Sequence, residues 1–453
     1  MTSKAVLRSY FAISGVYTLS ASLIWGVNTL FLLEAGLDIF GVFVAGAAFT
    51  AGNVLFEIPT GVVADTVGRR ASFLCSVSIL SVGTLAYVGI PYLAWKPLVL
   101  FSVASVFLGL GFSFYSGALE AWLVDSLHAS GFDGELDAVF SRGAMVSGTA
   151  MLIGTVGGGL LGQLDLSLPF LARSGLLTLA FVVALLGMRD LGFDARPLRL
   201  ETLRKELATV ARAGIRHGWS QRSLRLLMLA SAVQTGFIIW GFYAWQPYFL
   251  ELLETDAVWF AGVIASGVAL STMVGNAVVD YFARLCGRRT TLLVWAASIQ
   301  TVAAIGIGLS PSFPMALICL LVVTSTMGVV GPVRQAYIHK MVPAEQRATV
   351  VSFDSMVANL GGVGGQAGLG YLAQVRDYAT GYIAGGAVTV LAVPLYLGIR
   401  SLKEEADKII GKAGKKSPCA AQGLASIGGV DDKTHTAEAG IEGDPAFAAK
   451  AGA

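Results

Sequence analysis

The sequence predicts an all-α membrane protein with twelve transmembrane helices, arranged as two pseudo-symmetric six-helix bundles. Three observations support this fold class: few charges, twelve long apolar runs and an internal duplication. Of the 453 residues, 55% are hydrophobic and only 13% are charged. Soluble domains carry about 25% charged residues, so lipid must cover much of this surface.

Each apolar run is long enough to cross a bilayer, which takes about 20 residues as a helix. The first run follows Lys4 and Arg8, but it is long for a signal peptide and no Ala-x-Ala cleavage site follows it, so we read it as a retained span. The runs are residues 9–33, 39–63, 71–94, 98–124, 143–163, 168–188, 224–250, 257–280, 290–309, 313–338, 350–374 and 378–399.

Basic residues are distributed unequally between the two sets of loops. Of 31 basic residues, only Lys96, Arg173 and Arg376 fall in the loops of one side. Cytoplasmic loops are enriched in Lys and Arg, so we expect both termini in the cytoplasm. The expected location is the bacterial inner membrane.

The spans and the segments between them predict four regions. Residues 1–189 form an N-terminal six-helix bundle and residues 223–399 a C-terminal one. Residues 190–222 alternate apolar and basic positions, which predicts an amphipathic cytoplasmic linker on the membrane surface. Residues 400–453 contain almost no large apolar side chains, which predicts a disordered cytoplasmic tail.

The two halves resemble each other in sequence. Residues 57–70 align with 276–289 at the end of the second span of each half, and residues 116–125 align with 331–340 in the fourth. Parallel halves of this kind characterise one large transporter architecture.

The first copy carries a motif in the turn after its second span. Gly61-x-x-x-Asp65-x-x-Gly68-Arg69-Arg70 resembles the signature loop of the major facilitator superfamily. The resemblance covers residues 1 to about 400 and implies a latch that joins the two bundles on the cytoplasmic side. Alternatively, Arg69 and Arg70 only set the orientation in the membrane. In the second copy Asp280 and Arg284 replace the first Gly and the Asp, which predicts loss of the full gating role.

Two further stretches, 56–61 and 116–122, resemble drug:proton antiporters of the tetracycline and macrolide efflux type. Two departures weaken this resemblance: Ser105 stands where many of these antiporters have Arg, and the glycine-rich stretch 154–162 lacks their usual proline. The resemblance implies a secondary transporter that exports drug-like molecules or secondary metabolites in exchange for protons, by alternating access. A proton-coupled nutrient uptake symporter is the alternative, and a non-transporting receptor is a third reading.

An enzyme is not expected, because no nucleophile, metal or phosphate motif is present. The four cysteines and four histidines lack metal-ligand spacing, so no metal or cofactor is predicted. The expected partners are a small-molecule substrate, protons and the lipid bilayer, with no nucleic acid, and we expect a monomer.

Ionisable residues within spans are costly and usually functional. Glu57 and Glu120 are proton-coupling candidates, each with the alternative of a structural contact between helices. Four further charges are expected to pair at helix interfaces, with Asp125 near Arg69 and Asp354 near Arg347 as the expected pairs. These four are Asp125, Arg142, Arg334 and Asp354.

The resemblance also implies that the first, fourth, seventh and tenth spans line a central substrate cavity. Aromatic and amide side chains on three of these spans suit amphipathic ligands, although Trp and Tyr also form belts at membrane interfaces. The candidates are Tyr17, Trp25, Asn28, Ser113, Tyr115, Gln234, Trp240, Tyr243 and Gln246.

Overall fold

The computed structural model describes residues 2–93, 96–192, 212, 214–254, 257–343 and 346–409. One compact unit ends at Ile409. Most of the predicted linker 190–222, and the predicted tail beyond residue 409, lie outside the described residues, so the proposed amphipathic linker and disordered tail stay predictions.

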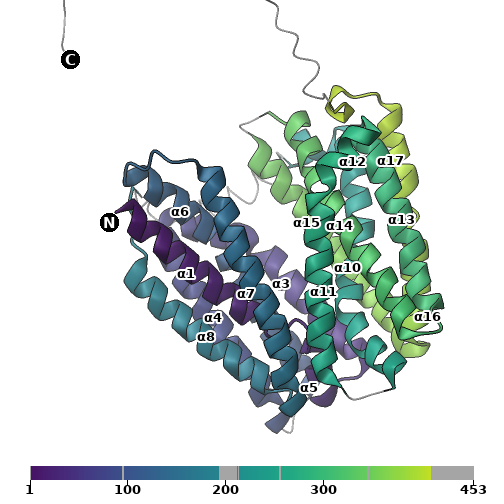
Figure 1. Cartoon of the computed structure of the whole chain (residues 1–453), viewed down its shortest axis with the longest axis horizontal. Helices are drawn as coiled ribbons and strands as arrows, with labels where there is room; N and C mark the ends of the chain where they lie inside the picture. Colours follow the sequence, from purple (N-terminus) through teal and green to yellow (C-terminus); the bar gives the residue numbers. More distant parts are fainter. Residues whose placement is uncertain are drawn as a thin grey trace, which may run out of the picture. The chain divides into compact units, whose positions relative to one another are not determined.

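The first half of the chain forms helices α1 to α8, which lie together in Figure 1. Short connections join these helices, including breaks within one span between α1 and α2 and between α5 and α6. Their bounds are α1 Ser3–Ser22, α2 Asn28–Glu34, α3 Ile39–Thr66, α4 Arg69–Gly89, η1 Ile90–Tyr92, α5 Pro97–Tyr115, α6 Ala118–Ala129, α7 Leu136–Leu164 and α8 Leu168–Gly187.

The second half forms helices α10 to α17, which lie beside the first group (Figure 1). Its bounds are η2 Gly214–Trp219, α10 Arg222–Leu253, α11 Val258–Ala277, α12 Val279–Cys286, α13 Arg289–Leu309, α14 Phe313–Met341, α15 Arg347–Val375, α16 Tyr378–Thr389, α17 Ala392–Ser401 and η4 Glu405–Asp407.

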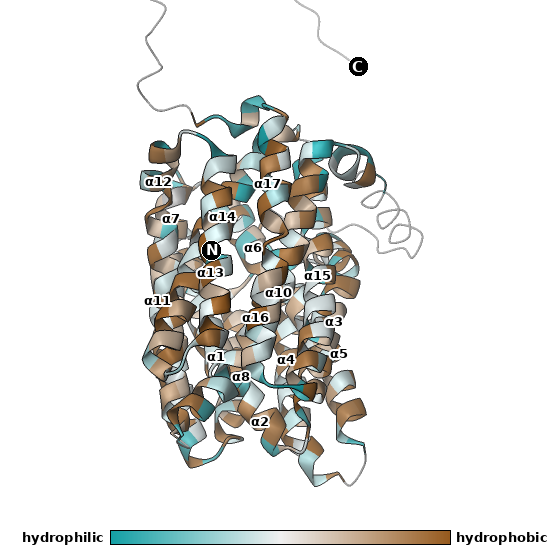
Figure 2. Ribbon diagram, turned by 90° about the vertical axis from the view of Figure 1, so that its right-hand side faces the viewer, coloured by the Kyte–Doolittle hydropathy of each residue, from teal (hydrophilic) through white to brown (hydrophobic). Residues whose placement is uncertain are grey.

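Ten helical segments in the described part of the chain are long and apolar enough to cross a membrane. The two other predicted spans, 9–33 and 350–374, are helical but do not meet that standard. The first is divided between α1 and α2, and the second lies in α15, where glycines and polar residues lower the hydropathy. Figure 2 shows hydrophobic residues along the helices and many hydrophilic residues at their ends.

Four predicted spans are interrupted where the sequence suggested one continuous helix. The first breaks after Ser22, the fourth between Tyr115 and Ala118, the eighth at Val278 and the twelfth at Val390. In the fourth span Gly117 has φ +74°, a left-handed conformation that glycine adopts without steric cost.

Large apolar side chains remain on the surface of many helices, among them Leu55, Val82, Ile153, Trp295 and Val302. Exposed apolar surface of this extent would be unfavourable in water, but it is normal for helices that face lipid. Small residues hold the helices close together: a Cβ on Gly109 of α5 would meet the backbone N of Asn53 in α3 at 2.7 Å.

The predicted tail boundary at residue 400 is wrong. α17 continues to Ser401, and η4 packs its Asp407 against the beginning of α13. Asp407 is only 2% exposed. One buried carboxylate with several donors orders this segment although it contains few large apolar residues.

Candidate functional site

The predicted signature loop is a tight turn between α3 and α4. α3 ends at Thr66, and Gly68 turns the chain with φ +127°, where a side chain would be strained. Arg69 then places its Nη2 2.6 Å from Oδ1 of Asp65 and its Nε 3.9 Å from Oδ2 of Asp125 in α6. The expected pairing of Asp125 with Arg69 is therefore present.

Arg70 fixes the same turn to the end of α8. Its backbone N–H donates to Oδ1 of Asp190 at 3.0 Å, and its Nη2 donates to the carbonyl of Leu185 at 2.7 Å. The N-terminus of α4 thus receives a carboxylate acceptor for an N–H that has no partner within the helix. Arg70 acts here inside its own bundle.

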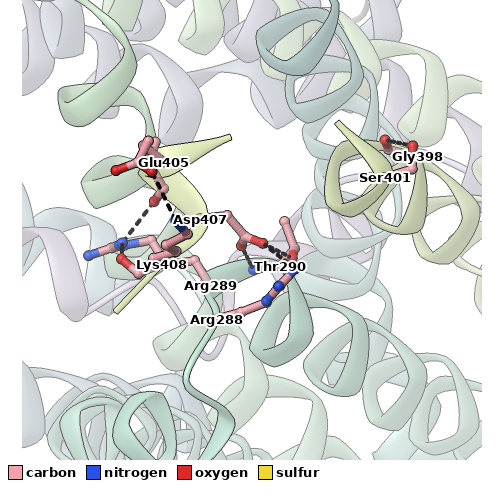
Figure 3. A network of polar contacts seen from close by, with 9 residues as sticks. Arg288, Arg289, Thr290, Gly398, Ser401, Glu405, Asp407 and Lys408 are labelled. Carbon is pink, nitrogen blue, oxygen red and sulfur yellow. Dashed lines mark hydrogen bonds and ion pairs between the residues drawn. The ribbon is translucent and has the colours of Figure 1, made fainter. Parts of the chain in front are cut away.

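The second copy of the turn is anchored in the same way, as Figure 3 shows. Asp407 accepts the backbone N–H of Thr290 at 2.7 Å and its hydroxyl at 2.9 Å. Arg289 Nη1 donates to the carbonyls of Ala406 and Lys408 at 2.8 and 2.7 Å. Each half therefore uses an Asp after its last helix to cap its third span, an anchor that the sequence did not predict.

The two bundles are joined at the helix ends that lie away from these turns. Gln246 of α10 is fully buried and accepts the N–H of Thr29 at 2.9 Å, and it donates to the carbonyl of Trp25 at 2.8 Å. Thr29 Oγ1 donates to the carbonyl of Tyr243 at 2.9 Å. Gln246 therefore caps the first turn of α2 from the opposite bundle.

Helices α7 and α11 make a second junction between the bundles. A Cβ on Gly159 would lie 2.8 Å from Cα of Gly262, so the two backbones touch. Thr155 and Ser266 share a hydrogen bond of 2.6 Å in the same contact. Small residues of this kind permit close helix packing in a membrane.

A third junction joins α3 and α15. Buried Gln366 donates to Oγ1 of Thr50 at 3.1 Å, and the backbone N–H of Phe40 donates to Gln374 at 3.1 Å. In contrast, the ion pairs that Asp65, Arg69 and Asp125 form in the described residues stay inside the N-terminal bundle.

A cavity of about 420 Å³ lies among residues of both bundles. Its wall combines aromatic rings with a few polar side chains, the composition of a small-molecule site. The polar and aromatic residues in the wall are Tyr17, Trp25, Asn28, Phe49, Thr50, Asn53, Thr84, Tyr87, Ser105, Phe112, Phe170, Arg173, Phe242, Tyr243 and Asn359.

Four predicted cavity residues, Tyr17, Trp25, Asn28 and Tyr243, line this wall. The other five do not, because neighbouring helices occupy their side chains. Ser113 bonds Thr60, Tyr115 stacks on Tyr17 with centroids 3.7 Å apart, Gln234 bonds Gln300 and Tyr396, Trp240 is fully buried among rings, and Gln246 joins the bundles.

Arg173 is the cavity residue that the sequence placed wrongly. Counted among the outer-loop charges, it instead lies within α8 and lines the cavity. Its position only five residues after the start of α8 made the two placements hard to distinguish. Its Nε is buried and has no hydrogen-bond partner within the described residues.

A second cavity of about 320 Å³ adjoins the first, since Trp25, Ile238 and Phe242 line both. Its wall is almost entirely apolar and comes mainly from α10, α11 and α14. The two chambers together place polar groups on the N-terminal side and an apolar surface on the C-terminal side.

The two glutamate candidates differ in their surroundings. Gly46, Thr50 and Asn53 of α3 line the cavity, and Glu57 is the next residue on that helical face. Its Oε2 is buried without a partner in the described chain. Glu120 is exposed in the first turn of α6, close to the phenols of Tyr10 and Tyr115.

The charges in the second bundle pair differently from the expectation. Arg334 Nη2 binds Oδ2 of Asp354 at 2.5 Å, and both side chains are largely buried. Arg347 instead donates its Nε to the carbonyl of Val342 at 3.2 Å. Arg334 lies near the end of α14 and Asp354 near the start of α15, so this pair depends on the packing of the two helices. Arg142 is exposed.

Comparison with known proteins decides the family. The model described as Major Facilitator Superfamily matches residues 10–281 and 259–429. The chain belongs to the major facilitator superfamily. It is a transporter of this family and not an enzyme, and its helices embed it in a membrane.

Individual relatives of this superfamily member are distant. The uncharacterized MFS-type transporter YxaM of Bacillus subtilis (strain 168) is 25% identical over 178 residues, which span 39% of this chain and 42% of that relative. The crystal structure of the nucleoside transporter NupG superposes with a TM-score of 0.72 at 10% identity, covering 87% of this chain and 99% of that one. A POT family transporter in complex with 5-aminolevulinic acid gives 0.69 at 15% identity, covering 89% and 96%. These two likenesses show the fold.

Proposed function

We propose that this protein exports drug-like molecules or secondary metabolites in exchange for protons, by alternating access. The observation that carries the proposal is a cavity with walls from both bundles. In the described residues, the three junctions between the bundles lie on the side away from the signature turn. A rocking motion that breaks those junctions and closes the opposite side would move the cavity contents across the bilayer.

We further propose that the signature-turn side is cytoplasmic, because basic residues concentrate there and cytoplasmic loops carry most Lys and Arg. The bundles are then joined on the outer side, and the cavity is accessible from the cytoplasm. When the bundles rock, the Asp65–Arg69–Asp125 cluster would meet the second bundle and act as the latch. The side chain of Asp65 is 63% exposed although it pairs with Arg69, so a residue of the second bundle could reach it.

Glu57 is the carboxylate that we assign to proton coupling. It follows the cavity-lining face of α3 and has a buried oxygen without a partner in the described chain. A carrier must exchange its proton when the water around it changes. The exposed Glu120 undergoes a smaller change of environment, and Asp354 is already held by Arg334.

The direction of transport is tested by comparing cells that produce the protein with cells that produce an Asp65→Asn variant, over a panel of toxic compounds. An exporter raises tolerance to its substrates, and the gain is reduced in the variant at equal protein abundance. Greater sensitivity to a compound in cells with the wild-type protein would show uptake instead and overturn the assignment of export.

A further inference from the structure

Among the residues that the structure describes, Arg173 is the single charged one in the wall of the larger cavity. It projects from α8, while the neighbouring wall positions carry the phenols of Tyr17 and Tyr87, on which its charge acts. Tyr87 is itself hydrogen-bonded to Ser105. The surroundings of the guanidinium are therefore neutral groups.

No carboxylate pairs with Arg173 in the part of the chain that the structure describes. The ion pairs there involve other arginines and one lysine, and the Nε of Arg173 has no acceptor. The guanidinium is partly buried, and burying part of a cation without a counter-charge is costly. Such a group persists where something outside the fold supplies the anion.

We propose that the substrate is an organic monoanion whose carboxylate binds Arg173. A guanidinium presents two parallel N–H donors that match a carboxylate, and one fixed positive charge balances one negative charge. This deepens the proposed function and rests on it, because it assigns a substrate class to the same cavity.

The second chamber accounts for the rest of the ligand. Beyond Trp25 and Phe242, which stand edge to face with centroids 6.2 Å apart, lies the apolar space lined by Phe237, Trp245 and Ala265. A ligand with its carboxylate at Arg173 would place an apolar or aromatic body there. The polar and apolar chambers thus select an amphipathic anion rather than a cation.

The test measures binding by the full-length protein in lipid nanodiscs without any proton gradient, so it is independent of coupling and direction. Naphthalene-2-carboxylate, its carboxamide and 2-naphthylmethylammonium form a matched panel, read by quenching of tryptophan fluorescence and by thermal stabilisation. We expect the carboxylate to bind most tightly. Arg173→Gln should weaken carboxylate binding about 10- to 100-fold, the loss of a charged hydrogen-bonded contact, and Arg173→Lys should retain part of it.

Arg376→Gln, an exposed arginine after α15, is the matched control and should bind like the wild type. The inference is overturned if the amide or the ammonium binds as tightly as the carboxylate, if no carboxylate binds, or if Arg173→Gln binds it unchanged. In each of these cases proton-coupled transport of a substrate held by contacts other than Arg173 would still stand. Loss of substrate-driven proton movement with intact carboxylate selectivity would overturn the coupling alone.

Discussion

Gln246 offers a direct way to shift the equilibrium between the two conformations of the transporter. Gln246→Leu keeps the side-chain volume but leaves the N–H of Thr29 and the carbonyl of Trp25 without their partners. Each orphaned buried group costs about 1–3 kcal/mol, and the cost applies only while the bundles are joined. The joined state should therefore lose roughly 2–6 kcal/mol, or about 30- to 20,000-fold in population.

The assay is the distance between spin labels at Glu34 and Glu251, exposed positions near the ends of α2 and α10. In Gln246→Leu the distribution should move to longer distances. Gln374→Leu is the control, because Gln374 makes an exposed contact with Phe40 that water can replace. A Gln246→Leu distribution identical to that of the wild type, with both proteins folded, would refute the role of Gln246 as a junction.

Three further predictions follow. Asp65→Asn should slow turnover. The protein should keep its normal abundance, because an exposed ion pair contributes only about 0–1 kcal/mol to stability. Asp280→Asn is the control, and if Asp65→Asn transports as fast as this control, the motif only sets the topology. Asp407→Ala should lower the free energy of unfolding by about 1–3 kcal/mol, because the N–H of Thr290 loses its acceptor. Glu405→Ala should leave the melting temperature unchanged. Equal melting temperatures of the two variants would show that the anchor is dispensable. In a cysteine-free background, Glu254→Cys should react with an impermeant reagent in whole cells and Arg216→Cys only after lysis, and the reverse would invert the topology.

The sequence predicted those parts of the protein that depend on local order. The helices follow from apolar runs, and the pairing of Asp125 with Arg69 was expected because both charges fall at the same end of neighbouring spans. The family followed from the motif around Gly68, whose positive φ only glycine adopts readily.

The rest depended on contacts between distant segments, which spacing does not encode. Gln246 was expected in the cavity because of its span, yet it bonds α2 across the bundle junction. Asp407 was assigned to the tail because most of its neighbours are charged, although it caps a helix more than a hundred residues earlier. Arg173 was counted as an outer charge although the predicted span 168–188 contains it, because it lies only five residues from the start of that span.

Proton movement driven by substrate is the most direct test of the central claim. In proteoliposomes, a compound selected from the toxicity panel should change the internal pH through the wild-type protein and through Glu120→Gln. Glu57→Gln keeps the shape of the side chain but cannot ionise, so it should bind the compound without moving protons. If Glu57→Gln moves protons with substrate as the wild type does, Glu57 is not the carrier; if the wild type moves none, transport is not proton-coupled.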